Sequence, residues 1–101
     1  MIKYLEKEKD FKDEIKDGNV LLDFYADWCG PCKMLGLSLE ELNDEREELK
    51  ILKVNVDKFE NIAREYSVMS IPTLIMYKNG KETNKEVGFL SSEELKHFID
   101  K

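Results

Sequence analysis

Trp28-Cys29-Gly30-Pro31-Cys32 lies between an apolar segment and a segment with helical periodicity. The preceding residues 20–25 predict a buried β-strand, and the residues from 33 to about 49 predict an α-helix. A thiol at the first turn of a helix lies where free N–H groups and the helix dipole favour a negative charge. The thiolate is the form that attacks disulfides, and a second thiol one turn later can close a ring with the first. The stretch therefore predicts a reversible dithiol–disulfide couple.

The composition is that of one globular domain. The chain has 101 residues, which is enough for one domain with a modest core and too few for two. Hydrophobic residues make up 42% and charged residues 38%, a mixture typical of a soluble globular protein rather than a disordered or membrane one. We expect a single domain over residues 1–101.

The charge and the N-terminal segment exclude several function classes. A net charge of −6 argues against binding to nucleic acid or to an anionic membrane, because both need clustered basic residues. The first ten residues contain no continuous apolar stretch, so we expect no signal peptide, and no apolar run reaches transmembrane length. We therefore expect a cytoplasmic protein, a compartment in which a C-x-x-C pair is more often redox-active or metal-binding than structural.

A zinc site is not expected. A closed zinc site takes about four ligands. The chain has two cysteines and one histidine, His97, which belongs to the last predicted helix and is expected on the surface. We predict no metal.

The first half of the chain shows alternating strand and helix patterns. Tyr4 and Leu5 suggest a short edge strand, and a four-residue apolar spacing predicts a short helix that ends near Gly18. Leucines at i, i+4 and i+7 line one face of the helix that follows the cysteines. Residues 51–56 alternate and are rich in β-branched side chains, so they predict a strand. The apolar positions of the two helices are Phe11 and Ile15, then Leu35, Leu39 and Leu42.

The second half carries turn and cap signals. Residues 57–60 (DKFE) resemble a capping box and predict a helix through about Tyr66. Residues 73–77 predict a strand, Asn79-Gly80 a two-residue hairpin, and residues 83–89 the returning strand. A second capping box at 91–94 (SSEE) predicts a last helix, whose inward residues are Leu95, Phe98 and Ile99.

This order of elements predicts an α/β fold. Strand, helix, strand, helix in the middle of the chain calls for a parallel pair with a right-handed crossover. The Asn79-Gly80 hairpin then adds an antiparallel pair. We expect a central mixed β-sheet of about five strands, flanked by about four helices on both faces.

At this point the chain resembles the thioredoxin family over nearly all of its length. The resemblance rests on residues 23–34 (DFYADWCGPCKM), 53–57 (KVNVD) and 71–74 (IPTL), followed by 77–80 (YKNG) and Val87-Gly88. A lone C-x-x-C would be a weak signal. The combination of motifs in this chain is a specific signal: it consists of W-C-G-P-C, an aspartate six residues before the first cysteine, and a later Ile-Pro-Thr. This combination implies the thioredoxin fold.

The resemblance implies a role for each residue of the motif. Cys29 is the nucleophile and the more exposed thiol, and Cys32 is the resolving thiol one turn inside the helix. Gly30 and Pro31 tune the reduction potential: Pro31 costs little early in a helix, and Gly30 lets a partner backbone approach. An unreactive structural Cys29 is the alternative.

Asp23 is a carboxylate in an otherwise apolar strand, and burial should raise its pKa. The resemblance makes it the proton acceptor that activates Cys32, and makes Lys53 the residue that modulates it. Alternatively, Asp23 is a polar residue at a strand end in contact with solvent.

The substrate-binding surface is also implied by the resemblance. Pro72 resembles the cis-proline that faces the cysteines, which would place the Ile71 backbone beside Cys29, where an extended substrate can pair with it. A trans proline that starts a strand is the alternative. Trp28, Ile71 and Gly88 would form an apolar rim around Cys29, although Trp28 could instead pack in the core.

The chain departs from the family's pattern in three places. Gly36-Leu37-Ser38 stands where many members have a proline in the active-site helix, so a proline kink is not expected. Ser70 replaces a frequent glycine, and Tyr25 stands where a second tryptophan is common. These changes should affect groove shape and partner choice more than the chemistry.

The function implied by the resemblance is that of a protein-disulfide reductase in cell redox homeostasis. It would carry two electrons on its thiols with no bound cofactor, since the chain has no G-x-G-x-x-G motif for a flavin or nicotinamide. Its partners would be disulfide-containing proteins and a separate thioredoxin reductase, and we expect a monomer. A thiol oxidase or isomerase of the same fold, and a binding module used regardless of redox state, remain alternatives.

Overall fold

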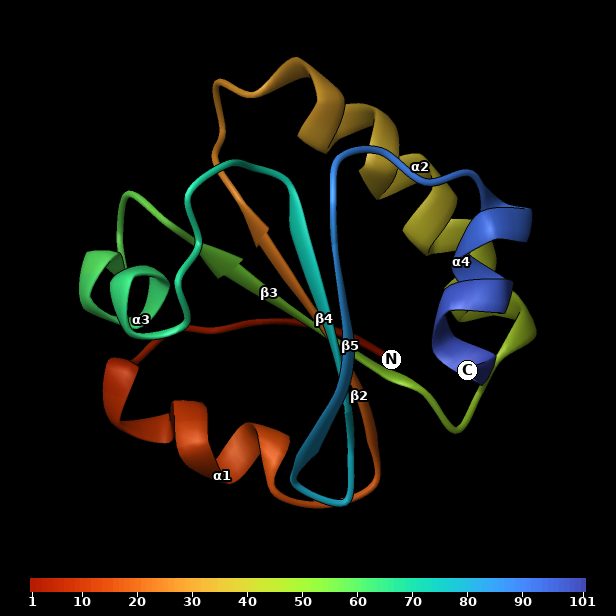
Figure 1. The fold of residues 1–101 in the computed structure, drawn as a ribbon, viewed down its shortest axis with the longest axis horizontal. Helices are drawn as coiled ribbons and strands as arrows, with labels where there is room; N and C mark the ends of the chain where they lie inside the picture. Colours follow the sequence, from red (N-terminus) through yellow and green to blue (C-terminus); the bar gives the residue numbers. More distant parts are fainter.

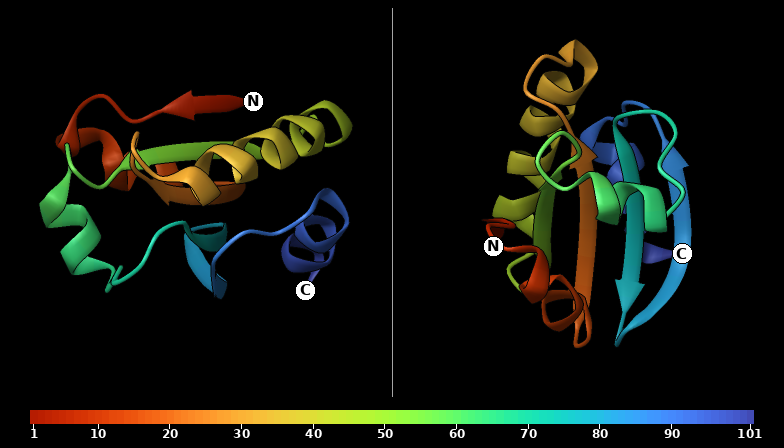
Figure 2. Two further views of the ribbon diagram at one scale, coloured as in Figure 1. Left: turned by 90° about the horizontal axis from the view of Figure 1, so that it is seen from above. Right: turned by 90° about the vertical axis from the view of Figure 1, so that its left-hand side faces the viewer.

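The computed structural model describes residues 1–101 and contains a sheet between two layers of helices (Figures 1 and 2). A short 3-10 helix at Glu8–Asp10 precedes the first α-helix. In chain order the elements are β1 (Ile2–Tyr4), α1 (Phe11–Ile15), β2 (Asn19–Tyr25), α2 (Gly30–Glu45), β3 (Lys50–Asn55), α3 (Glu60–Glu65), β4 (Thr73–Lys78), β5 (Lys81–Val87) and α4 (Ser92–Asp100).

The five strands form one mixed sheet in the order β1-β3-β2-β4-β5. β1, β3 and β2 are parallel, whereas β4 runs antiparallel to β2 and β5 antiparallel to β4. Figure 1 shows α1 and α3 on one side of the sheet and α2 and α4 on the other. The predicted α/β architecture, with its parallel part and its hairpin, is confirmed.

The central strand β2 explains why both faces are covered. Val20, Leu22 and Phe24 point into the core shared with α1 and α3. Leu21 points to the opposite face, into the core shared with α2 and α4. A strand that is apolar on both faces must lie inside a sheet with helices on each side, which is where β2 lies.

Two local signals act as predicted. Asn79 and Gly80 both have positive φ, at 51° and 83°, as the two-residue hairpin between β4 and β5 requires. At the start of α4 the Ser91 side chain accepts a hydrogen bond from the Glu94 backbone N–H, and the Glu94 side chain accepts one from the Ser91 N–H. The second capping box is therefore confirmed, and His97 is exposed on α4 as expected.

The first predicted capping box is wrong. α3 begins at Glu60 after Phe59, and no side chain caps it. The turn that precedes it is held instead by Asn55, whose side-chain oxygen accepts hydrogen bonds from the backbone N–H groups of Asp57 and Lys58. The Asp57 carboxylate accepts a hydrogen bond from Trp28, so it is engaged elsewhere.

Several predicted boundaries shift by a few residues. The edge strand is Ile2–Tyr4 rather than Tyr4 and Leu5, and the last strand ends at Val87. α2 ends at Glu45, because the next residue leaves helical geometry with φ −126° and ψ 84°. Leu49, expected in that helix, lies in the following loop and is still buried in the core, so its apolar character reflects packing and not helical periodicity. None of the helices is long and apolar enough to span a lipid bilayer.

Candidate active site

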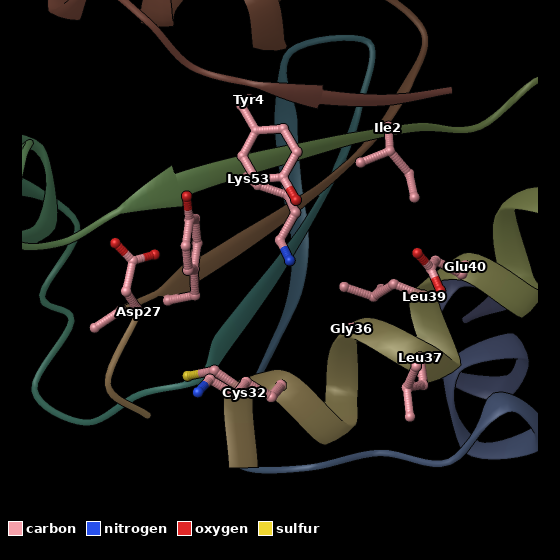
Figure 3. Close-up of a pocket in the computed structure, with 12 residues that line it drawn as sticks. Ile2, Tyr4, Asp27, Cys32, Gly36, Leu37, Leu39, Glu40 and Lys53 are labelled. Atoms are coloured by element: carbon pink, nitrogen blue, oxygen red, sulfur yellow. The ribbon is translucent and has the colours of Figure 1, made fainter. Parts of the chain in front are cut away.

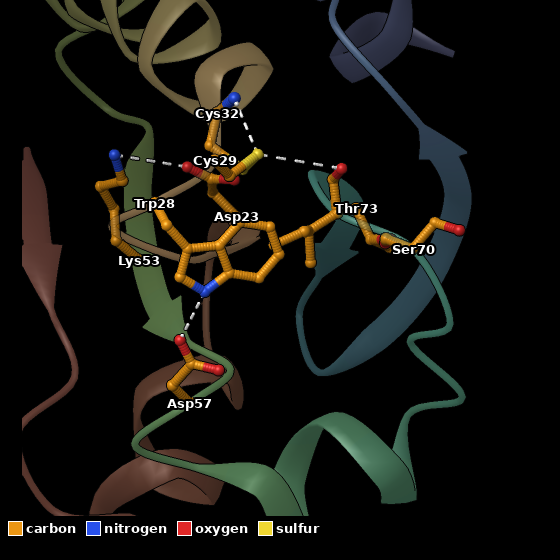
Figure 4. Close-up of a disulfide and its surroundings, with 9 residues drawn as sticks. Asp23, Trp28, Cys29, Cys32, Lys53, Asp57, Ser70 and Thr73 are labelled. Atoms are coloured by element: carbon orange, nitrogen blue, oxygen red, sulfur yellow. Dashed lines mark hydrogen bonds and ion pairs between the residues drawn. A yellow bond between two sulfur atoms is a disulfide. The ribbon is translucent and has the colours of Figure 1, made fainter.

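Cys29 and Cys32 form a disulfide at the start of α2 (Figure 4). Cys29 is the N-cap residue of this helix, with an extended backbone that feeds from β2 into the first turn. Its Sγ accepts a hydrogen bond from the backbone N–H of Cys32 at 3.2 Å. The sulfur therefore occupies the place where a helix N-terminus stabilises negative charge. Pro31, in the first turn, needs no hydrogen-bond partner for its nitrogen.

The two cysteines do not differ in exposure as expected. Cys29 is 4% exposed and Cys32 is 3% exposed, so neither is markedly more open. They differ instead in what lies beside them. Cys29 lines a groove of about 510 Å³ on one side of the disulfide, and Cys32 lines a cavity of about 280 Å³ on the other. We call these the front groove and the back cavity.

The front groove is largely apolar. It is lined by Trp28, Cys29, Gly30, Pro31, Val56, Val68, Met69, Ser70 and Ile71. Trp28 is 71% exposed, which rules out the alternative that it packs in the core. Its indole N–H donates a hydrogen bond of 2.9 Å to the Asp57 carboxylate, which fixes the ring beside the disulfide (Figure 4).

The loop before β4 forms the opposite wall of the groove. The Ile71–Pro72 peptide bond is cis. The carbonyl oxygen of Ile71 lies 4.0 Å from the Sγ of Cys29. Gly88, expected on the rim, does not line the groove; its N–H donates to the Pro72 carbonyl at 2.8 Å, so it supports the loop from behind.

Asp23 lies on β2 and is completely buried. Burial raises the pKa of Asp23 to about 6, although the nearby Lys53 ammonium acts in the opposite direction. The Nζ of Lys53 is 3.4 Å from one carboxylate oxygen, an ion-pair distance (Figure 4). Neither oxygen accepts a hydrogen bond of good geometry from the protein. The alternative of a solvated strand-end aspartate is therefore wrong.

The back cavity contains one member of this ion pair, Lys53, together with the second cysteine. It is bounded by β1, β3, the end of β2 and the first half of α2, and Cys32 and Lys53 both line it (Figure 3). Figure 3 shows the Lys53 ammonium pointing into the cavity toward α2. Asp23 has no exposed surface, and Lys53 is its charged partner at the cavity.

The three departures from the family's pattern fall around these two spaces. α2 runs without interruption from Gly30 to Glu45 through Gly36, which lines the back cavity. Tyr25 lines the same cavity, and Ser70 lines the front groove. Of the three departures, only Ser70 can therefore change the shape of the front groove. Gly36 and Tyr25 lie instead near the Asp23–Lys53 pair.

Some residues of the site were not singled out by the sequence. The pattern of residues 57–60 predicts Asp57 as a helix cap, although Asp57 also ends the motif KVNVD that resembles the family. Met69 is 93% exposed in the front groove, and its place directly before the Ser70-Ile71-Pro72 segment is the signal that could have found it. No sequence motif marks Tyr4 as a site residue, because only the pairing of β1 with β3 brings it next to Lys53. No three His, Cys, Asp or Glu side chains come together in a way that could hold a metal ion.

Comparisons with known proteins agree with this geometry. The family model described as Thioredoxin matches residues 2–101. The chain is 48% identical to the thioredoxin of Chlamydia trachomatis over 94 residues, which covers 93% of this chain and 92% of that protein. It is 45% identical to the thioredoxin of Bacillus subtilis over 95 residues, 93% of this chain and 91% of the relative.

A solved structure shows the same fold. Oxidised mitochondrial thioredoxin 3 from Saccharomyces cerevisiae superposes with a TM-score of 0.89 at 33% identity, and the match covers 98% of this chain and 93% of that one. The chain therefore belongs to the thioredoxin family and is a thiol–disulfide oxidoreductase, a protein-disulfide reductase whose redox centre is the Cys29–Cys32 pair.

Proposed function

We propose that, in the reduction of protein disulfides, Cys29 of this chain is the attacking thiol and Cys32 is the resolving thiol. The Cys29 thiolate attacks one sulfur of the substrate disulfide, that disulfide breaks, and the other substrate sulfur leaves as a thiolate. Cys32 then gives up its proton and attacks the Cys29 sulfur, which releases the second substrate thiolate. Two electrons pass to the substrate, and the Cys29–Cys32 disulfide remains.

The position of Cys29 carries this proposal. It caps α2, its sulfur accepts the Cys32 N–H, and it lines the front groove. A helix N-terminus favours the thiolate, and the groove gives a polypeptide access to it. Cys32 lies within the first turn and lines the back cavity, which suits a thiol that acts only on its neighbour.

Asp23 is proposed as the acceptor of the Cys32 proton, and Lys53 as the residue that modulates it. A carboxyl whose pKa is about 6 takes up a proton far more readily than an exposed aspartate does. It is still mostly ionised above that pH, so it can act as a base near neutrality. Gly30 and Pro31 are proposed to tune the potential of the couple.

A substrate strand is proposed to dock in the front groove. Trp28 and Ile71 supply apolar surface, and the Ile71 backbone before the cis Pro72 can pair with an extended chain. Gly88 acts indirectly, by holding the Pro72 carbonyl.

The rest of the cycle follows from the need to restore the dithiol. A separate thioredoxin reductase is proposed to reduce the Cys29–Cys32 disulfide, with no cofactor bound to this chain. A reductant must be kept reduced, so we place its action in the cytoplasm. We propose that it works as a monomer, without nucleic acid or membrane.

The reduction potential of the couple tests this function. Equilibration against a dithiol redox buffer should give roughly −270 mV, the value known for thioredoxin itself. A value at or above the roughly −180 mV of protein disulfide isomerase would mean that the couple oxidises or reshuffles disulfides, and the proposed transfer of electrons from this chain to its substrates would be wrong.

A further inference from the structure

Three side chains stand in one row across the parallel part of the sheet. In the register of β1, β3 and β2, Tyr4 pairs with Lys53 and Lys53 pairs with Asp23. Residues paired in this way point to the same face of a sheet. This face is the one covered by α2, because Ile51 and Leu21, each two residues before a member of the row, pack in that core.

The Lys53 ammonium lies over two aromatic rings. Its Nζ is 5.5 Å from the ring centre of Tyr4 and 4.8 Å from that of Tyr25. The two rings meet edge to face, with centres 6.1 Å apart. The Lys53 side chain is only 12% exposed, and a nearly buried ammonium needs partners of this kind.

The helix side of the ammonium offers no such contact. Gly36 faces it from α2, and a Cβ at that position would lie 3.9 Å from Nζ. Figure 3 shows Lys53 between Tyr4 and this turn of the helix. The side chain is therefore held from the sheet side by the rings, and on the other side it faces only the back cavity and Gly36, which has no side chain to hold it.

We propose that Tyr4 and Tyr25 are positioning residues, which hold the Lys53 ammonium against Asp23 and thereby set how readily Asp23 accepts the Cys32 proton. The inference rests on the proposed function, because it concerns the same proton transfer. Tyr4, on the edge strand, is the better of the two tyrosines to substitute, because it is 56% exposed and does not belong to the hydrophobic core.

Other charged groups near Lys53 could attract its ammonium if the two aromatic rings were lost. Lys33 and Glu40 on α2, and Asp27 after β2, line the same cavity and are exposed. An ammonium that is no longer held can turn toward Asp27 or Glu40. Asp23 would then lose the nearby positive charge that lowers its pKa, so its titration would move to higher pH.

The test is a direct titration of the Asp23 carboxyl by carbon NMR in the oxidised protein. Tyr4→Leu, which keeps apolar bulk but removes the ring, should raise the midpoint by roughly half a pH unit. Tyr4→Phe, which keeps the ring and loses only the hydroxyl, should leave the midpoint close to that of the unmodified chain. Lys53→Met should raise the midpoint further than Tyr4→Leu does.

A double variant separates a positioning role from a general structural one. In the Lys53→Met background, Tyr4→Leu should add no further shift, because its effect passes through the lysine. An unchanged or lowered midpoint in Tyr4→Leu, or an equal shift in the Lys53→Met background, would overturn the inference. Thermal unfolding of each variant checks that it is folded, and the exposed edge position of Tyr4 makes a large loss of stability unexpected for the Tyr4 substitutions.

The titration does not depend on turnover. If Asp23→Asn reduced substrates at the unmodified rate, the acceptor role of Asp23 would be refuted. The coupling between Tyr4, Lys53 and Asp23 would still stand or fall on the NMR result alone.

Discussion

The front groove and the back cavity lie on either side of one disulfide and differ in chemistry. The front groove, about 510 Å³, is lined mainly by apolar residues and by the exposed Trp28. The back cavity, about 280 Å³, holds the ammonium of Lys53, the charged partner of a fully buried carboxylate. An apolar surface suits contact with a polypeptide, whereas a buried ion pair suits the control of a proton.

This difference shows how two cysteines with the same exposure can have different tasks. Each thiol is defined by the space that it lines, Cys29 by the groove and Cys32 by the cavity. Substitutions in the front groove should therefore alter the affinity for substrate, and substitutions that disturb the Asp23–Lys53 pair beside the back cavity should alter the pH dependence of the reaction. Each of the following predictions tests that separation.

The largest effect on the rate of disulfide reduction is expected from Asp23→Asn, which changes the ion pair beside the back cavity. The substitution removes the proposed proton acceptor, so the rate of disulfide reduction at pH 7 should fall roughly tenfold to a hundredfold. The rise in rate with a midpoint near pH 6, where Asp23 ionises, should disappear. Stopped-flow measurements from pH 5 to pH 9 check both, with Asp44→Asn as the matched control, because Asp44 is an exposed carboxylate in α2 that lines neither the front groove nor the back cavity. An unaltered pH profile in Asp23→Asn would contradict the account.

The same substitution should stabilise the fold. Because the pKa of Asp23 is raised from 3.8 to about 6, its ionisation costs stability as the pH rises through that window. Asp23→Asn should therefore increase the free energy of unfolding by on the order of 3 kcal/mol at pH 8 and by almost nothing at pH 3. Urea unfolding at the two pH values measures this, and a loss of stability at pH 8 would show that the carboxylate is better accommodated than its burial indicates.

A smaller effect is expected in front, from Trp28→Ala. Loss of the exposed ring should raise KM for a protein substrate about tenfold, with little change in kcat or in the pH midpoint. Leu37→Ala is the matched control, because Leu37 is also exposed, at 65%, but lines the back cavity. If both variants raised KM equally, the groove would not be the docking surface.

The smallest effect should come from Asp57→Ala. This change removes the acceptor of the Trp28 indole N–H, an exposed hydrogen bond, so KM should rise only about twofold. The tryptophan fluorescence should change as well, since the ring loses its fixed orientation. Asp44→Ala, an exposed aspartate late in α2, controls for the loss of a negative charge. No change in fluorescence would mean that Asp57 does not orient the ring.

Much of the fold could be predicted because its signals are local. The two-sided apolar strand β2, the Asn79-Gly80 turn and the Ser91–Glu94 capping box each act within a few residues, and each is found as predicted. The capping box at residues 57–60 failed because distant partners decide that segment. The Asp57 side chain accepts from Trp28, 29 residues away, and leaves the turn to Asn55.

The site was predictable where the family's motif covers it and not elsewhere. Cys29, Cys32, Asp23 and Lys53 all belong to quoted motifs, and the structure places them together. Tyr4 could not be found in this way, because its place beside Lys53 depends on which strand lies at the edge and in which register. Strand order and register are tertiary properties that a short edge segment does not encode by itself.

The most direct test of the division between the two thiols is to trap the substrate. Cys29→Ser and Cys32→Ser, each mixed with a disulfide-bonded peptide, can be followed by mass spectrometry. We predict that Cys32→Ser accumulates a stable mixed disulfide on Cys29, while Cys29→Ser reacts roughly a hundredfold more slowly. Equally rapid adduct formation on Cys32 in Cys29→Ser would contradict the assignment of Cys29 to the groove and Cys32 to the cavity.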